Sequence, residues 1–198
     1  MIKAQLRPAL SMLALMVLVT GVVYPLAVTA VARLVLPGQA NGSVVIGSGG
    51  EPVGSALIGQ IFTDPEHFWS RPSAAPGGPY VPYDRTALAG SGGSNLGPLS
   101  FRLRQEVEQR IAALQAADTG NSASIPADLV TASASGLDPD ISLAAALYQA
   151  PRVARTRGIP EQVVLRLIRE HAQGRWLGVF GEPRVNVLAL NQALDALR

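Results

Sequence analysis

One long hydrophobic stretch, from residue 8 to residue 32, dominates the start of the chain and contains no charged residue. Lys3 and Arg7 precede it, and Arg33 follows it directly. Its 25 residues exceed the roughly 20 apolar residues that a helix needs to cross the hydrocarbon core of a bilayer. The pattern predicts one transmembrane helix near the N-terminus, and no later stretch resembles it.

A cleaved secretory signal is the alternative interpretation of this stretch. Basic residues precede it, and Ala30, Val31 and Ala32 form a small-x-small cleavage pattern. The apolar core of a signal usually runs for about 7 to 15 residues, which is shorter than this stretch, so we favour a retained anchor. Pro25 lies inside it, and a proline removes a backbone donor and can bend the helix. A bent helix suggests a partner helix packed beside it.

The basic residues around the helix predict its orientation. Two of them precede it, only Arg33 follows it closely, and the next one is Arg71. Under the positive-inside rule, the N-terminus then lies in the cytoplasm and the rest of the chain lies outside. We therefore expect a single-pass membrane protein, with an N-terminal segment and helix over residues 1–37 and an extracytoplasmic domain over residues 38–198.

The second domain mixes short strand patterns with helical ones. Its length suits one domain with its own core, and we expect a mixed α/β fold of the α+β class with short strands and about four helices. Strands are expected at residues 44–46, 55–62, 176–180 and 184–187, and an extended segment is expected at 129–135. Helices are expected at residues 99–114, with Pro98 in the first turn, at 160–171 and at 188–197. A further helix is expected to be capped by Asp140 and interrupted by Pro151.

Residues 70–98 are dominated by Pro, Gly, Ser and Ala, and the prolines exclude a long helix. Connections longer than about 12 to 15 residues in a compact domain are usually functional or disordered. Trp69, Tyr80 and Tyr83 supply aromatic anchors that a flexible tether does not need. We therefore predict a functional loop.

Composition and charge exclude several functions. A net charge of +2 and 48% hydrophobic residues argue against wholesale disorder. The arginines are scattered and Lys3 is the sole lysine, so a nucleic-acid partner is not expected. Without a lysine in the second domain, neither a P-loop nor an Asp-Lys-Thr-Gly phosphorylation site exists. Two histidines and no cysteine make a metal site improbable, and no cofactor is expected on this chain alone.

Hydrolase chemistry has weak support. The sequence Gly92-Gly93-Ser94-Asn95-Leu96 lacks the last glycine of a nucleophile elbow. Asp138 and Asp140 could form an acid–base pair, but helix capping explains them with fewer assumptions. A membrane-anchored extracytoplasmic hydrolase and a secreted binding protein, both unrelated to ion transport, are the alternatives to the interpretation given next.

Several motifs, taken in order, resemble the C subunit of the bacterial Kdp potassium-transporting P-type ATPase over nearly the whole chain. Each motif alone is weak, but their order and spacing are specific. They are the helix ending near Tyr24-Pro25-Leu26, Gly59-Gln60 with Phe62, FWSRPS at residues 68–73, SGGSNL at 91–96, residues 131–142, Gln149 with Arg152-Val153-Ala154, and GEPRVNVLALN at 181–191.

The resemblance implies an accessory, non-catalytic, single-pass subunit of a high-affinity potassium uptake complex in the inner membrane. Its partners would be a potassium-channel-like subunit, an ATP-hydrolysing subunit and the lipid bilayer. It also implies a catalytic chaperone that raises the ATP affinity of the hydrolysing subunit, so that ATP is reached only through the complex. The implied nucleotide-binding residues are Ser91, Gly92, Gly93, Ser94, Asn95 and Gln149, and the implied partner-binding residues are Gly21, Tyr24, Pro25, Trp69, Arg71, Asp138, Asp140 and Arg152.

Two points conflict with a complete transfer of the family's properties. Where the family is expected to have His or Asn in Asp-Pro-x-Ile-Ser, this chain has Asp140. ATP is cytoplasmic, whereas the positive-inside rule directs these loops outside the cell. We therefore favour an assembly and stabilising role, with the outer domain near the potassium entrance, over direct nucleotide contact.

Overall fold

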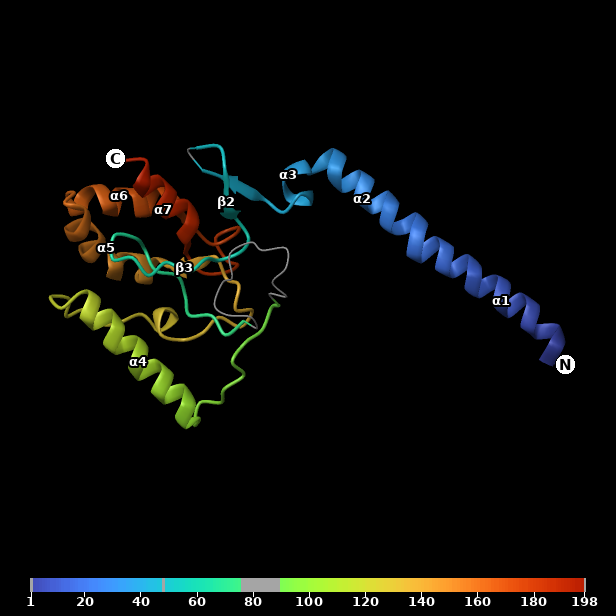
Figure 1. Ribbon diagram of the computed structural model, residues 1–198, viewed down its shortest axis with the longest axis horizontal. Coiled ribbons are helices and arrows are strands. Elements are labelled where there is room, and N and C mark those ends of the chain that lie inside the picture. Colours follow the sequence, from blue (N-terminus) through green and yellow to red (C-terminus); the bar gives the residue numbers. More distant parts are fainter. Residues whose placement is uncertain (1, 48, 76–89, 198) are drawn as a thin grey trace. The chain divides into compact units, whose positions relative to one another are not determined.

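The computed structural model describes residues 2–47, 49–75 and 90–197 (Figure 1). The chain divides into two compact units, Met1–Val44 and Val45–Arg198, and each is described by itself. A helical first unit is followed by a mixed α/β unit with short strands, which confirms the expected fold class. Tyr80 and Tyr83 of the predicted functional loop lie outside the described residues.

The first unit is almost entirely helical. It contains α1 (Ile2–Leu18), the π-helical turn η1 (Val19–Val23), α2 (Tyr24–Val35) and the short α3 (Pro37–Ala40). In the part of the chain that the structure describes, one helical run, Gln5–Val35, is long and apolar enough to span a membrane. Its 31 residues extend for about 46 Å at the rise of an α-helix, and none of its most hydrophobic window is buried.

The π-helical turn lies immediately before Pro25 and has a local cause. Proline at this position cannot donate to the carbonyl of Gly21, and its ring would clash with that carbonyl in a regular α-helix. The wider π turn across Val19–Val23 includes Gly21 and moves the carbonyls out of α register. The Thr20 hydroxyl donates a hydrogen bond to the Met16 carbonyl at 2.7 Å. The predicted disturbance at Pro25 therefore takes the form of a π turn.

The second unit contains two small sheets and four α-helices among its described residues. Strands β1 (Val44–Ile46) and β2 (Pro52–Ser55) form one sheet, and β3 (Asp140–Ser142), β5 (Arg184–Asn186) and β4 (Ala172–Gln173) form an antiparallel sheet in the order β3-β5-β4. The helices are α4 (Phe101–Ala117), α5 (Leu143–Arg157), α6 (Glu161–His171) and α7 (Val187–Asp195), with a 3-10 turn η2 (Ala127–Leu129).

The core lies where α5, α6 and α7 meet the central strand β5 (Figure 1). Small residues along α5 let α6 pack closely against it, and Val185 of β5 pairs with Ile141 on one side and Ala172 on the other. Helix α4 lies apart from these three helices and reaches the core through Leu114. The side chains that are no more than 2% exposed include Phe68, Ile141, Ala145, Val153, Val164, Ile168, Val185, Leu190 and Leu194.

Several expected elements are confirmed. The strand at residues 44–46 is present, and the helices predicted at residues 99–114, 160–171 and 188–197 correspond to α4, α6 and α7, with ends that differ by a few residues. Helix α4 begins later than expected because Ser100 caps it and accepts a hydrogen bond from the Leu103 amide. Pro98 therefore precedes the helix.

The prediction of a strand at residues 55–62 is wrong. Strand β2 ends at Ser55, whose hydroxyl accepts a hydrogen bond from the Leu57 amide and closes a turn. The chain after it donates from Gly59 to the Leu137 carbonyl instead of continuing a ladder. The strand expected at residues 176–180 is also a turn, with one bridge between Trp176 and Phe180.

Asp140 does not cap α5, which corrects the expected role of this carboxylate. The cap is Ser142, whose hydroxyl accepts a hydrogen bond from the Ala145 amide at 3.0 Å. Asp128 fixes that cap by accepting hydrogen bonds from both the amide and the hydroxyl of Ser142. Asp140 lies two residues earlier, in β3, because pairing with Asn186 of β5 keeps it extended.

Pro151 does not interrupt α5, which continues to Arg157. The two residues before the proline and the two after it are buried, namely Gln149, Ala150, Arg152 and Val153. Tertiary packing therefore stabilises the helix across the proline. Leu147, whose carbonyl loses its donor, lies on the exposed side of the helix, where water can satisfy that carbonyl. The segment expected to be extended at residues 129–135 begins instead in η2 and continues without a strand.

Candidate functional site

The candidate site is built around residues 64–73, here called the central segment, which crosses α5 and α7. Asn191 on α7 accepts a hydrogen bond from the Phe68 amide at 2.8 Å and donates to the Phe68 carbonyl at 3.0 Å. Gln149 on α5 accepts a hydrogen bond from the Trp69 amide at 2.8 Å and donates to the Trp69 carbonyl at 3.2 Å. Two buried side-chain amides thus hold successive residues in the way that a neighbouring strand would.

Arg152 binds the start of the central segment from one turn further along α5. Only 2% of it is exposed, and it donates to the carbonyls of Pro65 and His67 and to the side-chain oxygen of Gln149. Its guanidinium lies 4.6 Å from the centre of the Trp69 ring, within the range of a cation–π contact. Burial lowers the pKa of Arg152 to about 10, so the side chain stays charged at neutral pH.

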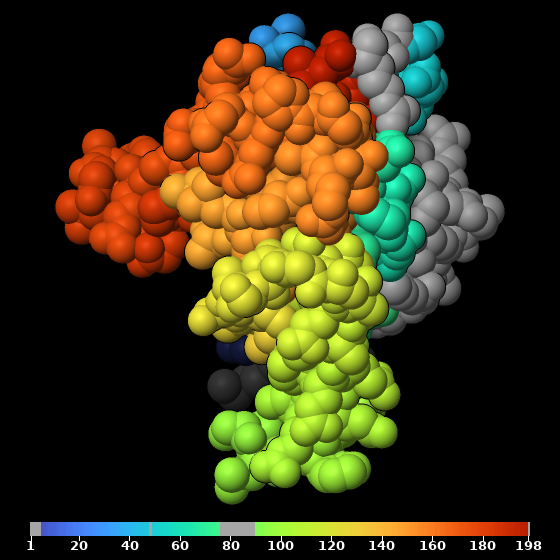
Figure 2. Space-filling view, turned by 90° about the vertical axis from the view of Figure 1, so that its left-hand side faces the viewer, coloured from blue at the N-terminus to red at the C-terminus, as the bar shows by residue number. Residues whose placement is uncertain are grey.

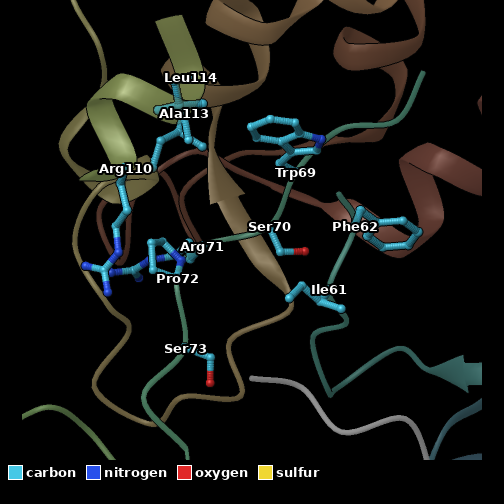
Figure 3. Close-up of a pocket in the computed structure, with 11 residues that line it drawn as sticks. Ile61, Phe62, Trp69, Ser70, Arg71, Pro72, Ser73, Arg110, Ala113 and Leu114 are labelled. Atoms are coloured by element: carbon cyan, nitrogen blue, oxygen red, sulfur yellow. The ribbon is translucent and has the colours of Figure 1, made fainter. Parts of the chain in front are cut away.

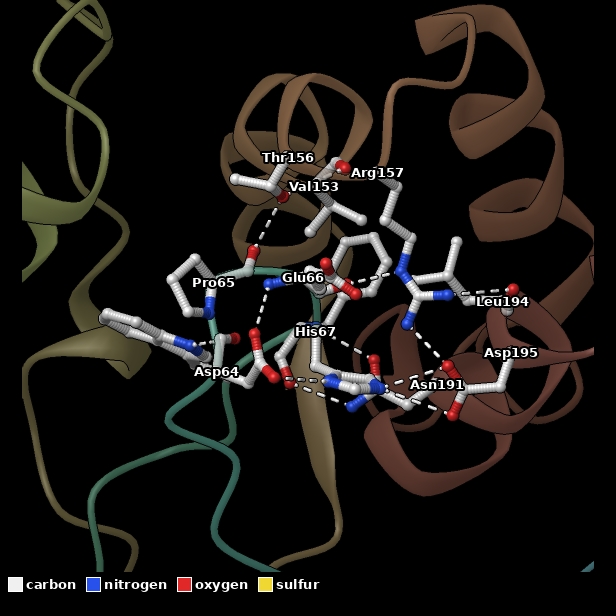
Figure 4. Close-up of polar contacts among 12 residues, drawn as sticks. Asp64, Pro65, Glu66, His67, Val153, Thr156, Arg157, Asn191, Leu194 and Asp195 are labelled. Carbon is white, nitrogen blue, oxygen red and sulfur yellow. Dashed lines mark hydrogen bonds and ion pairs between the residues drawn. The ribbon is translucent and has the colours of Figure 1, made fainter. Parts of the chain in front are cut away.

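A second group of polar contacts fixes the central segment to the end of α7 (Figure 4). Arg157 donates to the Glu66 carbonyl at 2.7 Å and forms an ion pair with Asp195 at 2.5 Å. His67 lies 3.1 Å from the same carboxylate of Asp195. Burial raises the pKa of Asp195, but the hydrogen bond from Arg157 and the nearby His67 outweigh it and hold this pKa below its usual value.

The other end of the central segment is bound to residues 133–138. Arg71 forms an ion pair with Asp138 at 2.7 Å, and Ser73 donates to the Gly136 carbonyl at 2.6 Å. The Ser133 amide donates to the Pro72 carbonyl. These contacts bring together two of the loops that the sequence analysis identified.

The third loop, residues 91–95, lies on the other side of residues 133–136. The Ser91 hydroxyl and the Gly92 amide both donate to the Ser135 carbonyl, at 3.0 and 2.8 Å. A Cβ atom on Gly93 would lie 2.7 Å from the Ala134 carbonyl oxygen, so a side chain cannot be accommodated there without a shift. Ser94 and Asn95 complete this loop, with Asn95 in the left-handed region at a φ of 52°.

A small cavity of about 180 Å³ opens between the central segment and α4 (Figure 3). Figure 3 shows Arg71 and Arg110 on one side of it and Phe62 on the other. Arg110 is paired with Glu106 and donates to the Val130 carbonyl. This volume lies below the roughly 300–1,000 Å³ of typical small-molecule sites. The lining residues are Ile61, Phe62, Trp69, Ser70, Arg71, Pro72, Ser73, Arg110, Ala113, Leu114 and Leu129.

The two predicted carboxylates have different partners. Asp138 accepts from Arg71 and from the backbone amide of Asp140, whereas Asp140 pairs with Arg184 at 2.9 Å. Burial raises the pKa of Asp140 despite the opposing charge of Arg184, and the negative charge of Asp138 adds to the rise. Their contacts fix β3 against β5 and against the central segment. Among the described residues, no group of three His, Cys, Asp or Glu side chains could hold a metal ion.

The remaining predicted residues belong to the first unit. Gly21 lies in the π turn, and Tyr24 and Pro25 begin α2, where the Tyr24 side chain is exposed. These three residues are therefore neighbours in the apolar helix, and each is exposed in the first unit.

The sequence analysis gave no site role to Asn191, which ends one of its motifs, and it missed Arg157 and Asp195 altogether. Asn191 had a usable signal, because it is a polar residue among Val187, Leu188, Leu190 and Leu194 on the apolar face of a helix. A buried amide on such a face needs a hydrogen-bond partner. Arg157 and Asp195 had no comparable signal, since ordinary helix-end charges look the same in a sequence.

These features fit a single-pass membrane protein with one α+β domain whose motif loops converge on the central segment. The family described as "K+-transporting ATPase, c chain" matches residues 6–196, and the chain belongs to this family, KdpC. A potassium-transporting ATPase KdpC subunit of Polaromonas naphthalenivorans (strain CJ2) is 59% identical over 193 residues, which cover 98% of this chain and 95% of the relative.

Two further relatives carry the same name. The protein of Variovorax paradoxus (strain S110) is 60% identical over 192 residues, with 96% of this chain and 95% of the relative covered. That of Methylibium petroleiphilum is 56% identical over 196 residues, with 99% of both chains covered. The family resemblance inferred from the motifs is thereby confirmed, and the chain is a component of a potassium-transporting ATPase complex.

Proposed function

We propose that this chain is a non-catalytic subunit that assembles and stabilises an ATP-driven, high-affinity potassium uptake complex. The observation that carries the proposal is the use of the motif residues. Gln149, Arg152 and Asn191 are buried and bind the chain's own backbone, so their chemistry maintains the shape of the second unit. A rigid, shaped surface is what a protein needs to hold partner subunits in a fixed geometry.

The proposed partners are the potassium-channel-like subunit and the ATP-hydrolysing subunit. The apolar helix supports a contact within the membrane, since none of its most hydrophobic window is buried inside the unit and Gly21 leaves room for a close approach. In the second unit, Trp69, Arg71, Asp138, Asp140 and Arg152 would act by fixing the central segment and β3 that the partner contacts.

We further propose that the N-terminus lies in the cytoplasm, that residues 38–198 lie outside it, and that the membrane is the inner membrane. The charge difference across the helix supports this orientation, because Lys3 and Arg7 precede the helix and Arg33 alone follows it closely.

Cysteine labelling of intact cells tests the orientation. The chain has no cysteine of its own, so Glu108→Cys on the exposed face of α4 introduces a single thiol. A membrane-impermeant maleimide is expected to label this variant in intact cells. Gln5→Cys is the matched control and should react only after the cells are opened. The reverse pattern would contradict the proposed orientation.

A second proposal concerns ATP. By family resemblance, this subunit raises the ATP affinity of the hydrolysing subunit, with Ser91, Gly92, Gly93, Ser94, Asn95 and Gln149 as the implied residues. What favours it is the convergence of residues 91–95 on residues 133–136 and the central segment, which links these motifs in one rigid group. Because Gln149 is 1% exposed, its influence would pass through the central segment.

Gln149→Ala in the intact complex tests the ATP proposal. We expect a several-fold weaker apparent ATP affinity of the ATPase activity, because the backbone amide and carbonyl of Trp69 both lose their hydrogen bonds to the Gln149 side chain. Leu147→Ala, on the exposed side of the same helix, is the control and should leave the affinity unchanged. An unchanged affinity in Gln149→Ala, with the complex fully assembled, removes this residue from the mechanism.

A further inference from the structure

Residues 175–182 form a hairpin that projects from the second unit and ends in an apolar tip. Trp176, Leu177, Val179 and Phe180 are between 60% and 73% exposed, and we call residues 176–180 the hairpin tip. In Figure 2 this segment lies in the orange-red lobe that projects at the left. Isolated apolar residues on a surface are normal, but four large ones gathered on a projection mark an interaction site.

The hairpin tip is held in one shape by its own backbone. Trp176 and Phe180 exchange two backbone hydrogen bonds, at 2.8 and 2.9 Å, and their rings lie 5.7 Å apart. The amides of Gly178 and Val179 donate to carbonyls of the same hairpin. An ion pair of 2.7 Å between Arg175 and Glu182 closes its base.

The backbone at the hairpin tip is left-handed at two successive residues. Leu177 and Gly178 both adopt positive φ values, of 52° and 73°. A left-handed conformation is unfavourable for a residue such as leucine, yet the result of the turn is to point large apolar side chains into solvent. None of the described residues of the second unit covers these side chains, which leaves them 60% to 73% exposed.

The chemistry of the hairpin tip matches a lipid surface. Its side chains carry no charge, and their one polar group is the indole N–H of Trp176. The neighbouring charges are already paired, Arg175 with Glu182 and Arg184 with Asp140. Four of the five backbone amides of the tip, those of residues 176, 178, 179 and 180, are bound internally, which suits a lipid environment, where an unsatisfied donor is costly. Tryptophan favours the boundary between headgroups and acyl chains.

A protein partner suits this tip less well. Protein interfaces typically contain about one hydrogen bond per 100–200 Å² of contact, and the hairpin tip offers one side-chain donor for its whole surface. A lipid surface requires no such complementarity, because the apolar area itself drives insertion.

The chain also keeps the second unit near a bilayer. Helix α2 ends at Val35 and the second unit begins at Val45, which leaves nine residues, 36–44, between them. Nine residues reach at most about 30 Å when fully extended. If the apolar helix spans the membrane, the second unit is therefore tethered beside the surface of that membrane.

We propose that the hairpin tip inserts into the headgroup and acyl boundary of the membrane that the apolar helix spans. The chain would then contact phospholipid at two places, which restricts the tilt and rotation of the second unit on the membrane. This inference rests on the proposed membrane span, and the experiment below separates a failure of the span from a failure of the inference.

Single-cysteine variants of the full-length chain in phosphatidylcholine vesicles test the proposal. Leu177→Cys carries the environment-sensitive fluorophore NBD at the tip, and Val179→Cys is a second variant in case the first fails to fold. Glu108→Cys on α4 is the negative control, and Leu15→Cys in α1 is the positive control for the span. Lipids with a nitroxide on the acyl chain act as quenchers.

We expect blue-shifted NBD emission at the tip, with at least about twofold quenching by the nitroxide lipids, since the tip would lie in the acyl boundary. The probe at residue 15 should also be quenched, and the probe at residue 108 should not. Vesicles with brominated acyl chains should quench the fluorescence of the unlabelled chain, and Trp176→Leu should remove most of that effect because Trp69 is the other tryptophan.

Three results would overturn the proposal. Quenching at residue 15 but not at the tip would leave the span intact and reject insertion of the hairpin. A change at the tip that requires the larger subunits to be reconstituted with the chain would identify a protein as the occupant. Absence of quenching at residue 15 would reject the proposed span, and the inference with it.

Discussion

Asn191→Ala is expected to lower the free energy of unfolding of the second unit by about 3 kcal/mol, because two buried backbone groups lose their partners. The Asn191 side chain binds both the amide and the carbonyl of Phe68, and Phe68 is completely buried. Water cannot reach these groups to replace the lost bonds. Urea unfolding, monitored by Trp69 fluorescence in a Trp176→Phe background, measures the loss.

Gln192→Ala is the matched control, because it removes a side-chain amide from the neighbouring position of α7, which is only partly buried. Its effect should stay within about 0.5 kcal/mol, as is usual for surface substitutions. Equal stability of the two variants would show that the pairing with Phe68 contributes little, and the account of the central segment would then be wrong.

Arg152→Met is expected to cost about 3 kcal/mol, since hydrogen bonds to charged groups contribute more than neutral ones. Methionine keeps much of the apolar volume but leaves the carbonyls of Pro65 and His67 without this donor. Replacing a buried ion pair by apolar residues is often harmless, but here the partners are neutral backbone carbonyls, and methionine cannot replace the partly buried hydrogen bonds that Arg152 donates to them. The same unfolding measurement in the Trp176→Phe background gives the loss.

Arg152→Lys separates charge from geometry. A lysine keeps the positive charge but cannot present several donors in a plane, so it should recover only part of the stability that methionine loses. Arg166→Met on α6 removes an exposed arginine with a 4.0 Å contact to Glu170 and should have little effect. If lysine restores full stability, charge alone explains Arg152 and the directional hydrogen bonds are unnecessary.

The parts of the fold with a strong local pattern were predictable from the sequence. The apolar helix follows from its length, and α6 from Val164, Leu167 and Ile168, which lie on one face at helical spacing and are buried. The helix ends were less predictable, because Asp140 and Ser142 are both good capping residues. The choice between them depends on Asp128 and on the pairing of β3 with β5, neither of which a local pattern contains.

The candidate site was predictable as a set of motifs but not as a set of contacts. The sequence identified Gln149 and Arg152, three residues apart on one helix face, yet their partners lie 80 or more residues away in the central segment. Asn191 reaches Phe68 across 123 residues. A hydrogen bond between a side chain and a distant backbone leaves no periodic signal, which is why the internal role of these amides emerges only from the fold.

The π turn in the apolar helix has a consequence for recognition inside the membrane. A turn with i→i+5 hydrogen bonds holds about one residue more than an α turn, and each residue of an α-helix covers about 100°. The row of side chains on one face of α1 therefore does not continue along the same face of α2. In α2 the corresponding row is rotated around the helix axis. If the helix spans a bilayer, each leaflet would meet its own face of one helix, and two different neighbours could be held by a single span without competing for the same row.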